Sequence, residues 1–257
     1  MRQIMMIPDR KRMSDCIGLM NEYNLGFEYN DFFIPGILDS EVKTDEIITE
    51  YGNYDRPAYN TVHGAFYDVI PSSMDAKIRE ISDLRIRQSL NAARKMSAHA
   101  VIFHTNYNPF LNSKQYIEGW IKQNAEYWSG LLEEYPDVSI YLENMFDTTP
   151  DILGELSGRL CRYPNYGVCL DYAHAAITKT DPAEWARELG KFVKHVHIND
   201  NDMVSDLHLA WGDGTIDREG FYKSYEQYLG DVSVLIETSS TEKINRSLVL
   251  LKKEGFL

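Results

Sequence analysis

The chain has 257 residues, a length typical of one large α/β domain, and we expect a single domain over residues 1–257. Hydrophobic residues make up 44% and charged residues 25% of the chain, the balance of an ordinary globular protein. The formal net charge of −13 argues against a nucleic-acid partner, because phosphate binding needs a basic surface.

The three cysteines, Cys16, Cys161 and Cys169, show no C-x-x-C spacing, and pairing would leave one over. We therefore expect reduced thiols in a cytoplasmic protein. The apolar run at the N-terminus is too short for a signal peptide, and no run approaches the roughly 18 apolar residues of a membrane span. The sequence leaves the oligomeric state open, and a homo-oligomer is one alternative.

Short apolar runs rich in Val, Ile, Tyr and Phe recur along the chain and predict eight β-strands. In chain order these are Gln3–Ile7, Leu25–Tyr29, Tyr59–His63, Ala100–His104, Val138–Glu143, Tyr166–Asp171, Val193–Ile198 and Val232–Glu237. Amphipathic runs between them predict helices. These are Ser14–Tyr23, the weakly periodic Asp39–Glu50, Ser73–Met96, Trp120–Glu134, Pro150–Leu160, Pro182–Leu189, Arg218–Tyr228 and Thr241–Lys253.

Strands that alternate with helices predict a parallel sheet, either a closed (β/α)8 TIM barrel or an open doubly wound sheet. Two observations favour the barrel. No glycine-rich nucleotide fingerprint follows the first strand. Polar residues also follow the C-terminal ends of at least six strands, and a barrel brings those ends together at one mouth.

The candidate site residues gather at these strand ends. His63, His104, Glu143, Asp171, His174 and Glu237 lie at or just beyond the end of an apolar run. The densest segment contains His195-Val-His197-Ile-Asn-Asp200-Asn-Asp202, followed by Asp206-Leu-His208 and Gly212-Asp-Gly214. Carboxylate and imidazole groups without a thiolate suit Mn²⁺, Co²⁺, Zn²⁺ or Mg²⁺. The sequence therefore predicts a divalent metal ion at the barrel mouth.

Glu143 and Glu237 each end an apolar strand and would face the barrel interior. Burying an unpaired carboxylate is costly, so a cation or a proton should accompany each one. The alternative for both is a salt bridge inside the barrel.

The remaining strand-end groups differ in what they indicate. Asp171 and His174 are three positions apart where a strand becomes a loop, so both can reach one cation. His195 and His197 share a strand face, and we choose His197 as the ligand because it is nearer the C-terminal end. His195 is either a deeper packing group or a group that supports a metal ligand from behind. Residues 200–202 could equally be turn formers.

Other candidates have equally ordinary structural explanations. Taken singly, His63 and His104 are hydrogen-bonded structural residues more often than ligands. Trp211 and Phe66 lie in predicted loops at the mouth, where they either form an aromatic wall against a sugar or pack in the core. Lys179 is either a phosphate contact or a solvated surface lysine.

Together these residues resemble a known family. The motifs are His63-Gly-Ala-Phe-Tyr-Asp68 with Pro71, Leu142-Glu143-Asn144, Cys169-Leu-Asp171-Tyr-Ala-His174-Ala, His195-Val-His197-Ile-Asn-Asp200-Asn, Asp206-Leu-His208, Gly212-Asp-Gly214-Thr-Ile-Asp217 and Glu237. They look like the xylose-isomerase-like TIM barrels, specifically the sugar phosphate isomerase/epimerase group. The resemblance covers most of the chain from about His63 to Glu237.

The resemblance implies a metal ion held by Glu143, Asp171, His197 and Glu237, with the two glutamates as the acid/base pair. It implies contacts to a small-molecule sugar from His174, and we add His63, His104, Asp206, His208 and Trp211 to the expected substrate-binding set. An arginine that sugar epimerases often carry after the H-x-H-x-x-D segment is missing, and Asn201-Asp202-Met203 stands there. The substrate contacts of the epimerases therefore do not carry over at this position.

The same superfamily contains the endonuclease IV type of DNA-repair enzyme, with three zinc ions. All nine of its ligand types have matches here, namely His63, His104, Glu143, Asp171, His174, His197, Asp206, His208 and Glu237. The net charge and the lack of evident basic loops stand against that activity. The segment Asn-Met-Phe-Asp-Thr-Thr-Pro after Glu143 resembles the sugar enzymes more closely.

Four functions follow as hypotheses. The preferred one is a metal-dependent isomerase or epimerase of a small sugar or sugar derivative, acting through an enediolate. A dehydratase or lyase of a sugar-derived polyol shares the carbanion-like step. A trinuclear zinc phosphodiesterase and a catalytically silent sugar- or protein-binding barrel are the remaining alternatives.

Overall fold

The computed structural model describes residues 2–257 and contains a closed barrel of eight parallel strands in sequential order. The barrel prediction is confirmed, and the open doubly wound sheet is excluded. The strands are β1 Ile4–Met6, β2 Gly26–Tyr29, β3 Asn60–His63, β4 Ala100–His104, β5 Ser139–Glu143, β6 Tyr166–Asp171, β7 Val193–Ile198 and β8 Ser233–Ile236. Each lies within its predicted range because every strand is a run of mostly buried, largely β-favouring residues.

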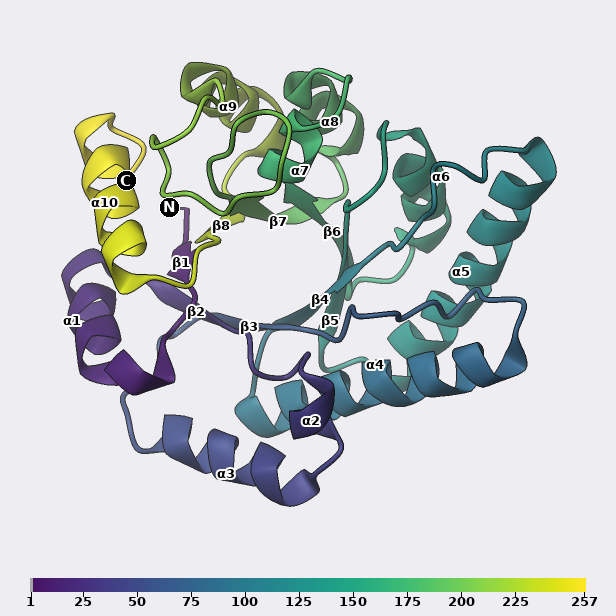
Figure 1. The fold of residues 1–257 in the computed structure, drawn as a ribbon, viewed down its shortest axis with the longest axis horizontal. Helices are drawn as coiled ribbons and strands as arrows, with labels where there is room; N and C mark the ends of the chain where they lie inside the picture. The colour runs from purple at the N-terminus through teal and green to yellow at the C-terminus, as the bar shows by residue number, and fades with distance from the viewer. Residues whose placement is uncertain (1) are drawn as a thin grey trace.

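The helices form an outer ring around the strands (Figure 1). Their bounds are α1 Met13–Tyr23, α2 Pro35–Leu38, α3 Glu41–Gly52, α4 Ala76–Met96, α5 Lys114–Glu134, α6 Asp151–Leu160, α7 Tyr172–Ala176, α8 Pro182–Leu189, α9 Arg218–Ser224 and α10 Thr241–Lys253, with a 3₁₀ turn η1 at Arg10–Arg12 and a π-helical turn η2 at Tyr225–Leu229. Among the described residues, no helix is both long and apolar enough to cross a membrane.

Helix starts follow local capping chemistry. Asp181 accepts a hydrogen bond from the backbone N–H of Ala183, and Pro182 is the first residue of α8, as the sequence predicts. Ser113 caps α5 in the same way, so this helix begins six residues before the predicted Trp120. The capping residue, rather than the start of the apolar periodicity, therefore sets this boundary.

Helices α4 and α5 are both 21 residues long and extend past the rest of the ring on one side (Figure 1). The apolar positions of α4 divide accordingly. Ile86 and Leu90 are fully buried, whereas Ile78, Ile81 and Leu84 are 37–47% exposed. The helical periodicity of α4 therefore continues beyond the part of the helix that packs on the barrel.

Strand parity decides which side chains enter the barrel. Along β5, Tyr141 and Glu143 belong to the inward-facing set, and along β6 the inward set includes Cys169 and Asp171. Tyr141 and Cys169 form a small interior cluster below the mouth. The carboxylates one step further along each strand are therefore held at the C-terminal rim, on top of a packed interior.

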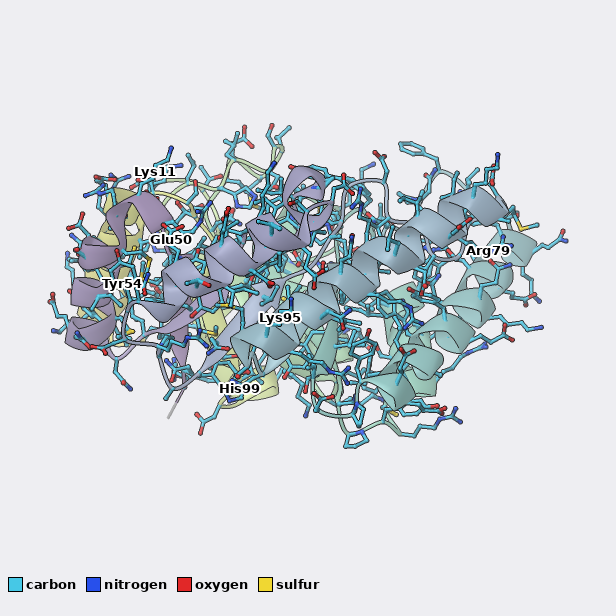
Figure 2. All side chains as sticks on the ribbon, turned by 90° about the horizontal axis from the view of Figure 1, so that it is seen from below. Lys11, Glu50, Tyr54, Arg79, Lys95 and His99 are labelled. Atoms are coloured by element: carbon cyan, nitrogen blue, oxygen red, sulfur yellow. The ribbon has the colours of Figure 1, made fainter. Side chains whose placement is uncertain are left out.

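The two ends of the barrel are separated in the side view (Figure 2). Lys11, which follows β1, marks the C-terminal face, and His99, which precedes β4, marks the opposite face. The imidazole of His99 stacks on the ring of Tyr59, with the ring centroids 4.5 Å apart. Both residues precede a strand, so they lie at the end of the barrel opposite the mouth. His99 is therefore a structural residue of the N-terminal face.

The segment between β7 and α9 is ordered by one carboxylate. The Asp200 carboxylate accepts hydrogen bonds from the backbone N–H groups of Asn201, Gly212 and Ile216 at 2.9–3.1 Å. Asp200 therefore fixes the conformation of this loop. Gly212 has φ +97°, and a Cβ on Gly214 would lie 2.3 Å from the carbonyl oxygen of Asn201. The Gly-Asp-Gly motif thus exists because the loop closes tightly on Asp200.

We expect Gly214→Ala to lower the free energy of unfolding by about 1–3 kcal/mol, because its Cβ meets backbone that has little room to shift. Gly130→Ala is the matched control. Nothing lies within 4 Å of its Cβ position inside α5, so that substitution should stabilise the protein by about 0.5–1 kcal/mol. Urea unfolding of both variants checks the expectation, and equal effects would contradict it.

Candidate metal centre

Nine side chains converge at the mouth from separate parts of the chain. His63, His104, Glu143, Asp171 and His197 lie at the C-terminal ends of β3 to β7, and Glu237 directly follows β8. His174 lies on α7, whose N-cap is Asp171; the Asp-x-x-His spacing therefore arises because the carboxylate caps the helix that carries the histidine. Asp206 and His208 come from the β7–α9 loop and lie nearer to solvent.

A first group of ligand atoms surrounds one oxygen of Glu143. The Nε2 atoms of His63 and His104 each lie 3.6 Å from Glu143 Oε2. The ligand atoms of these three residues all lie within 4.8 Å of one another, a spacing that could hold a metal ion.

A second group surrounds the other oxygen of Glu143. The ligand atoms of Glu143, Asp171 and His197 also lie within 4.8 Å of one another. His197 Nδ1 is 3.5 Å from Glu143 Oε1 and 3.6 Å from Glu237 Oε2, so the two glutamates approach the same ring nitrogen. Glu143, Asp171 and His197 are three of the four ligands that the family resemblance implies, and the fourth, Glu237, contacts His197.

A third group is formed at the rim around Asp206. His208 Nε2 lies 2.9 Å and His174 Nε2 lies 3.5 Å from Asp206 Oδ2. His174 Nδ1 is also 3.6 Å from Asp171 Oδ2, which connects this group with the second. The nine side chains are thus one continuous cluster with three places where ligand atoms converge.

The orientation of the imidazoles suits metal binding. A backbone carbonyl only accepts hydrogen bonds, so a histidine nitrogen that contacts one carries the proton and leaves the other nitrogen free to coordinate. Three histidines have Nδ1 fixed in this way, His63 on Gly64 O at 3.0 Å, His174 on Asn144 O at 2.9 Å and His208 on Glu237 O at 3.0 Å. Their Nε2 atoms are those that face Glu143 and Asp206.

Several buried polar atoms at this place lack a hydrogen-bond partner among the described residues. They are both oxygens of Glu143, Oδ2 of Asp171 and Nδ1 of His197. Leaving such groups unpaired is costly, and an ion is the partner that would satisfy all of them at once. The donor set and its geometry are therefore consistent with a divalent metal site.

Without an ion, burial and mutual charge set the protonation of the cluster. Burial opposes ionisation of Glu143, but the surrounding imidazoles, His197 foremost, hold its pKa well below the ordinary value. Burial raises the pKa of Asp171 well above its ordinary value and lowers that of His104 to about 3. His104 is therefore neutral at physiological pH, as a metal ligand must be.

One residue of the centre has no counterpart in the sequence predictions. Glu28, on β2, is fully buried; its Oε1 lies 3.3 Å from His197 Nε2, and its Oε2 lies 3.3 Å from His195 Nε2. Thr61 Oγ1 donates to Glu28 Oε2 at 2.7 Å, and Ser233 Oγ lies 2.7 Å from His195 Nδ1. The Glu28 carboxylate thus faces Nε2 of His197, while Nδ1 of the same ring faces Glu143 and Glu237.

The signal for Glu28 was present in the sequence. It is the one charged residue in the run Leu-Gly-Phe-Glu-Tyr, and a carboxylate in a barrel strand needs a partner just as Glu143 does. Cys169 Sγ also lies within 4.8 Å of ligand atoms of His195 and His197. Burial raises the pKa of this thiol well above its ordinary value, so it lies in the interior as a neutral thiol.

The two aromatic candidates have different places. Trp211 is 1% exposed, donates from Nε1 to the Tyr222 hydroxyl at 3.0 Å and packs on Phe221, so it belongs to the hydrophobic core and not to the mouth. Phe66 does line the mouth, with its ring stacked on His104 at 4.6 Å. Lys179 is exposed and is not part of the cluster.

The cluster opens into a cleft of about 250 Å³. Its walls are Ile7, Asn30, Phe33, His63, Phe66, His104, Met145, His174, Asp206, His208, Glu237, Thr238 and Ser239. No Lys or Arg side chain is among them, so the cleft offers a ligand carboxylates, imidazoles, a few neutral polar groups and an apolar edge.

Fold and site together define an α/β barrel with a candidate divalent-metal centre at the C-terminal mouth. The chain belongs to the family described as xylose isomerase-like TIM barrel, whose sequence profile matches residues 24–253.

Known proteins share the sequence or the fold. The uncharacterized protein MJ1311 of Methanocaldococcus jannaschii is 29% identical over 203 residues, 75% of this chain and 68% of the relative. The TTHB071 protein of Thermus thermophilus, in a structure soaked with ZnCl₂, has a TM-score of 0.75 at 21% identity over 98% of this chain and 96% of its own. A D-tagatose 3-epimerase-like protein has a TM-score of 0.75 at 23% identity over 97% and 96%. At these identities the two structures show a shared fold.

We expect Glu28→Gln to weaken Zn²⁺ binding by about 10–100-fold, because the amide presents no negative charge to the His197 imidazole and can turn an N–H toward it. Glu219→Gln is the matched control, since Glu219 is an exposed residue of α9. Competition with a chelator of known affinity measures the change. Equal zinc affinity of the two variants and the wild type would contradict the proposed role of Glu28.

Proposed function

We propose that the protein is a metal-dependent isomerase or epimerase of a small sugar or sugar derivative. The observation that carries the proposal is the arrangement of Glu143, at the end of β5, and Glu237, just after β8, which lie 3.5 and 3.6 Å from His197 Nδ1. Two carboxylates beside one metal position are what proton removal and return at neighbouring carbon atoms require.

In this proposal, Glu143, Asp171, His197 and Glu237 hold the ion. A bound divalent ion supplies the positive charge that stabilises developing negative charge on neighbouring carbonyl and hydroxyl oxygens of the substrate. One glutamate removes the C–H proton to give the enediolate, and the same or the other glutamate returns a proton. Isomerisation returns it to the adjacent carbon, and epimerisation returns it to the opposite face. His174 and His208, with Nε2 at the cleft, orient the substrate hydroxyl groups.

Two features support a neutral sugar. The cleft walls contain no Lys or Arg to pair with a phosphate. One similar fold is that of a D-tagatose 3-epimerase-like protein, and the family as a whole is described as xylose isomerase-like. A dehydratase or lyase acting on a related polyol would use the same first step, the removal of a proton beside a carbonyl.

A second candidate function is phosphodiester hydrolysis at a trinuclear zinc centre. The specific observation in its favour is that ligand atoms also converge in the first and third groups, around Glu143 Oε2 and Asp206 Oδ2. Four carboxylates and five neutral imidazoles carry a charge of about −2 with one divalent ion and about +2 with three. The first total suits a neutral sugar and the second suits a phosphodiester.

We expect the Mn²⁺- or Zn²⁺-loaded protein to exchange a carbon-bound proton of a ketose with solvent deuterium. Glu143→Gln and Glu237→Gln should each reduce this exchange about 10²–10⁴-fold, because each removes an acid/base group. Exchange into a panel of ketoses is followed by NMR, with bound metal measured in every variant and Glu219→Gln as control. No exchange with any ketose, or unchanged exchange in both glutamine variants, would contradict the proposal.

Metal content separates the two candidate functions. We expect about one tightly bound divalent ion per chain in protein purified and dialysed against excess zinc, measured by inductively coupled plasma mass spectrometry. About three tightly bound zinc ions per chain, together with hydrolysis of a model phosphodiester such as bis(4-nitrophenyl) phosphate, would favour the second candidate.

A further inference from the structure

A second cavity adjoins the metal cleft. It has a volume of about 870 Å³ and lies among the loops that follow β3, β4, β5 and β6. Phe66, His104 and Met145 line both spaces, so the cavity adjoins the cleft at the edge of the candidate metal centre. Nothing in the proposed proton transfer uses it.

The walls of this cavity are largely apolar. The apolar side chains include Phe66, Tyr67, Ile70, Phe110, Phe146 and Ile177. Phe110 is 89% exposed, and Tyr67 and Phe146 are each 57% exposed. Contiguous large apolar side chains at a concave surface mark a place where an apolar group binds, because each of them gains by removal from water.

One polar group in the cavity lacks a partner. Asp147 is 3% exposed, and its Oδ2 accepts hydrogen bonds from Thr105 Oγ1 at 2.5 Å and from the N–H of Met145 at 3.1 Å. Its Oδ1 is buried and has no hydrogen-bond partner among the described residues. Asp147 lines this cavity and also the neighbouring hollow beside Asn112 and Asp151, and a hydroxyl or amine donor that reaches Oδ1 would satisfy it.

We propose that this cavity binds an aromatic or short aliphatic group of the substrate, and that a hydroxyl or amine on this group donates to Asp147. No Lys or Arg lines the cavity, so it does not suit a phosphate. Resting on the proposed function, this defines the substrate as a two-part molecule, with a polyol portion in the metal cleft and an apolar substituent beside it. A small free sugar would leave the cavity unused.

The probe that tests the cavity carries no sugar. 2-Phenylethanol combines a benzene ring with one hydroxyl donor, and its methyl ether has nearly the same shape without the donor. Binding to the zinc-loaded protein is measured by ligand-observed NMR. Phe146→Ala removes one exposed wall, and Tyr54→Ala removes another exposed aromatic side chain, one that lines neither cavity nor cleft.

We expect 2-phenylethanol to bind wild type and Tyr54→Ala equally, to bind Phe146→Ala at least tenfold more weakly, and to bind better than its methyl ether. In Mn²⁺-loaded protein the ring protons of the bound alcohol should relax faster than in the Mg²⁺-loaded protein, because the ring lies next to the centre. No binding at the solubility limit, or binding that is unchanged in Phe146→Ala, overturns the proposal.

A second copy of the chain is the competing partner for the exposed aromatic side chains of the cavity, Tyr67, Phe110 and Phe146. A concentration-dependent dimer in analytical ultracentrifugation that Phe110→Ser dissociates would identify that occupant and overturn the proposal. Because 2-phenylethanol has no polyol, its binding is independent of the isomerase activity. If 2-phenylethanol binds but no ketose exchanges its proton, only the proposed isomerase or epimerase reaction is rejected. If a ketose exchanges its proton but 2-phenylethanol does not bind, only the proposed apolar binding site is rejected.

Discussion

The constraint on which the site depends is the burial of negative charge inside the barrel. Glu143 is fully buried and both of its oxygens lack a hydrogen-bond partner, yet the imidazoles of four histidines lie 3.4–3.6 Å from them, namely His63, His104, His174 and His197. Such an arrangement is stable only when positive charge is supplied, by protonated histidines or by an ion. The strands, α7 and the β7–α9 loop each place histidine side chains at the mouth, where they can carry positive charge or bind an ion.

The fold could be predicted from the sequence because its signal is repeated eight times. Most of the strands are short apolar runs with a polar residue at or just after the end, and strand parity then places Glu143, Asp171 and His197 on the inward face near the C-terminal rim. The convergence of the strand-end residues followed from topology alone. No side-chain geometry was needed to expect it.

The remaining features could not be predicted because they depend on packing between distant segments. Trp211 lies in the core since the β7–α9 loop folds back against α9, which no local pattern indicates. Ile81 is exposed because α4 continues past the barrel wall. Glu28 has a local signal as a charged residue within a strand, but its partners His195 and His197 come from β7, far along the chain, and no local pattern identifies them.

The two adjoining spaces have opposite chemical character. The cleft presents ionisable groups and the cavity presents aromatic rings, and Phe66 stacks on His104 where they join. A ligand that spans both would be oriented by this contrast, since a polyol loses hydration in the cavity and an apolar ring gains little in the cleft.

The β7–α9 loop carries two of the nine candidate ligands, Asp206 and His208. Asp200 and two glycines hold its shape, and contacts of His208 and Trp211 join it to Glu237, α9 and α10. The other seven candidate ligands lie at the strand ends or on α7. Exchange of a single surface segment would alter how many cations the mouth accommodates, and with it the charge of the molecules it attracts, while the strands beneath stay unchanged. A scaffold divided in this way lets related barrels diverge in chemistry at little cost to folding.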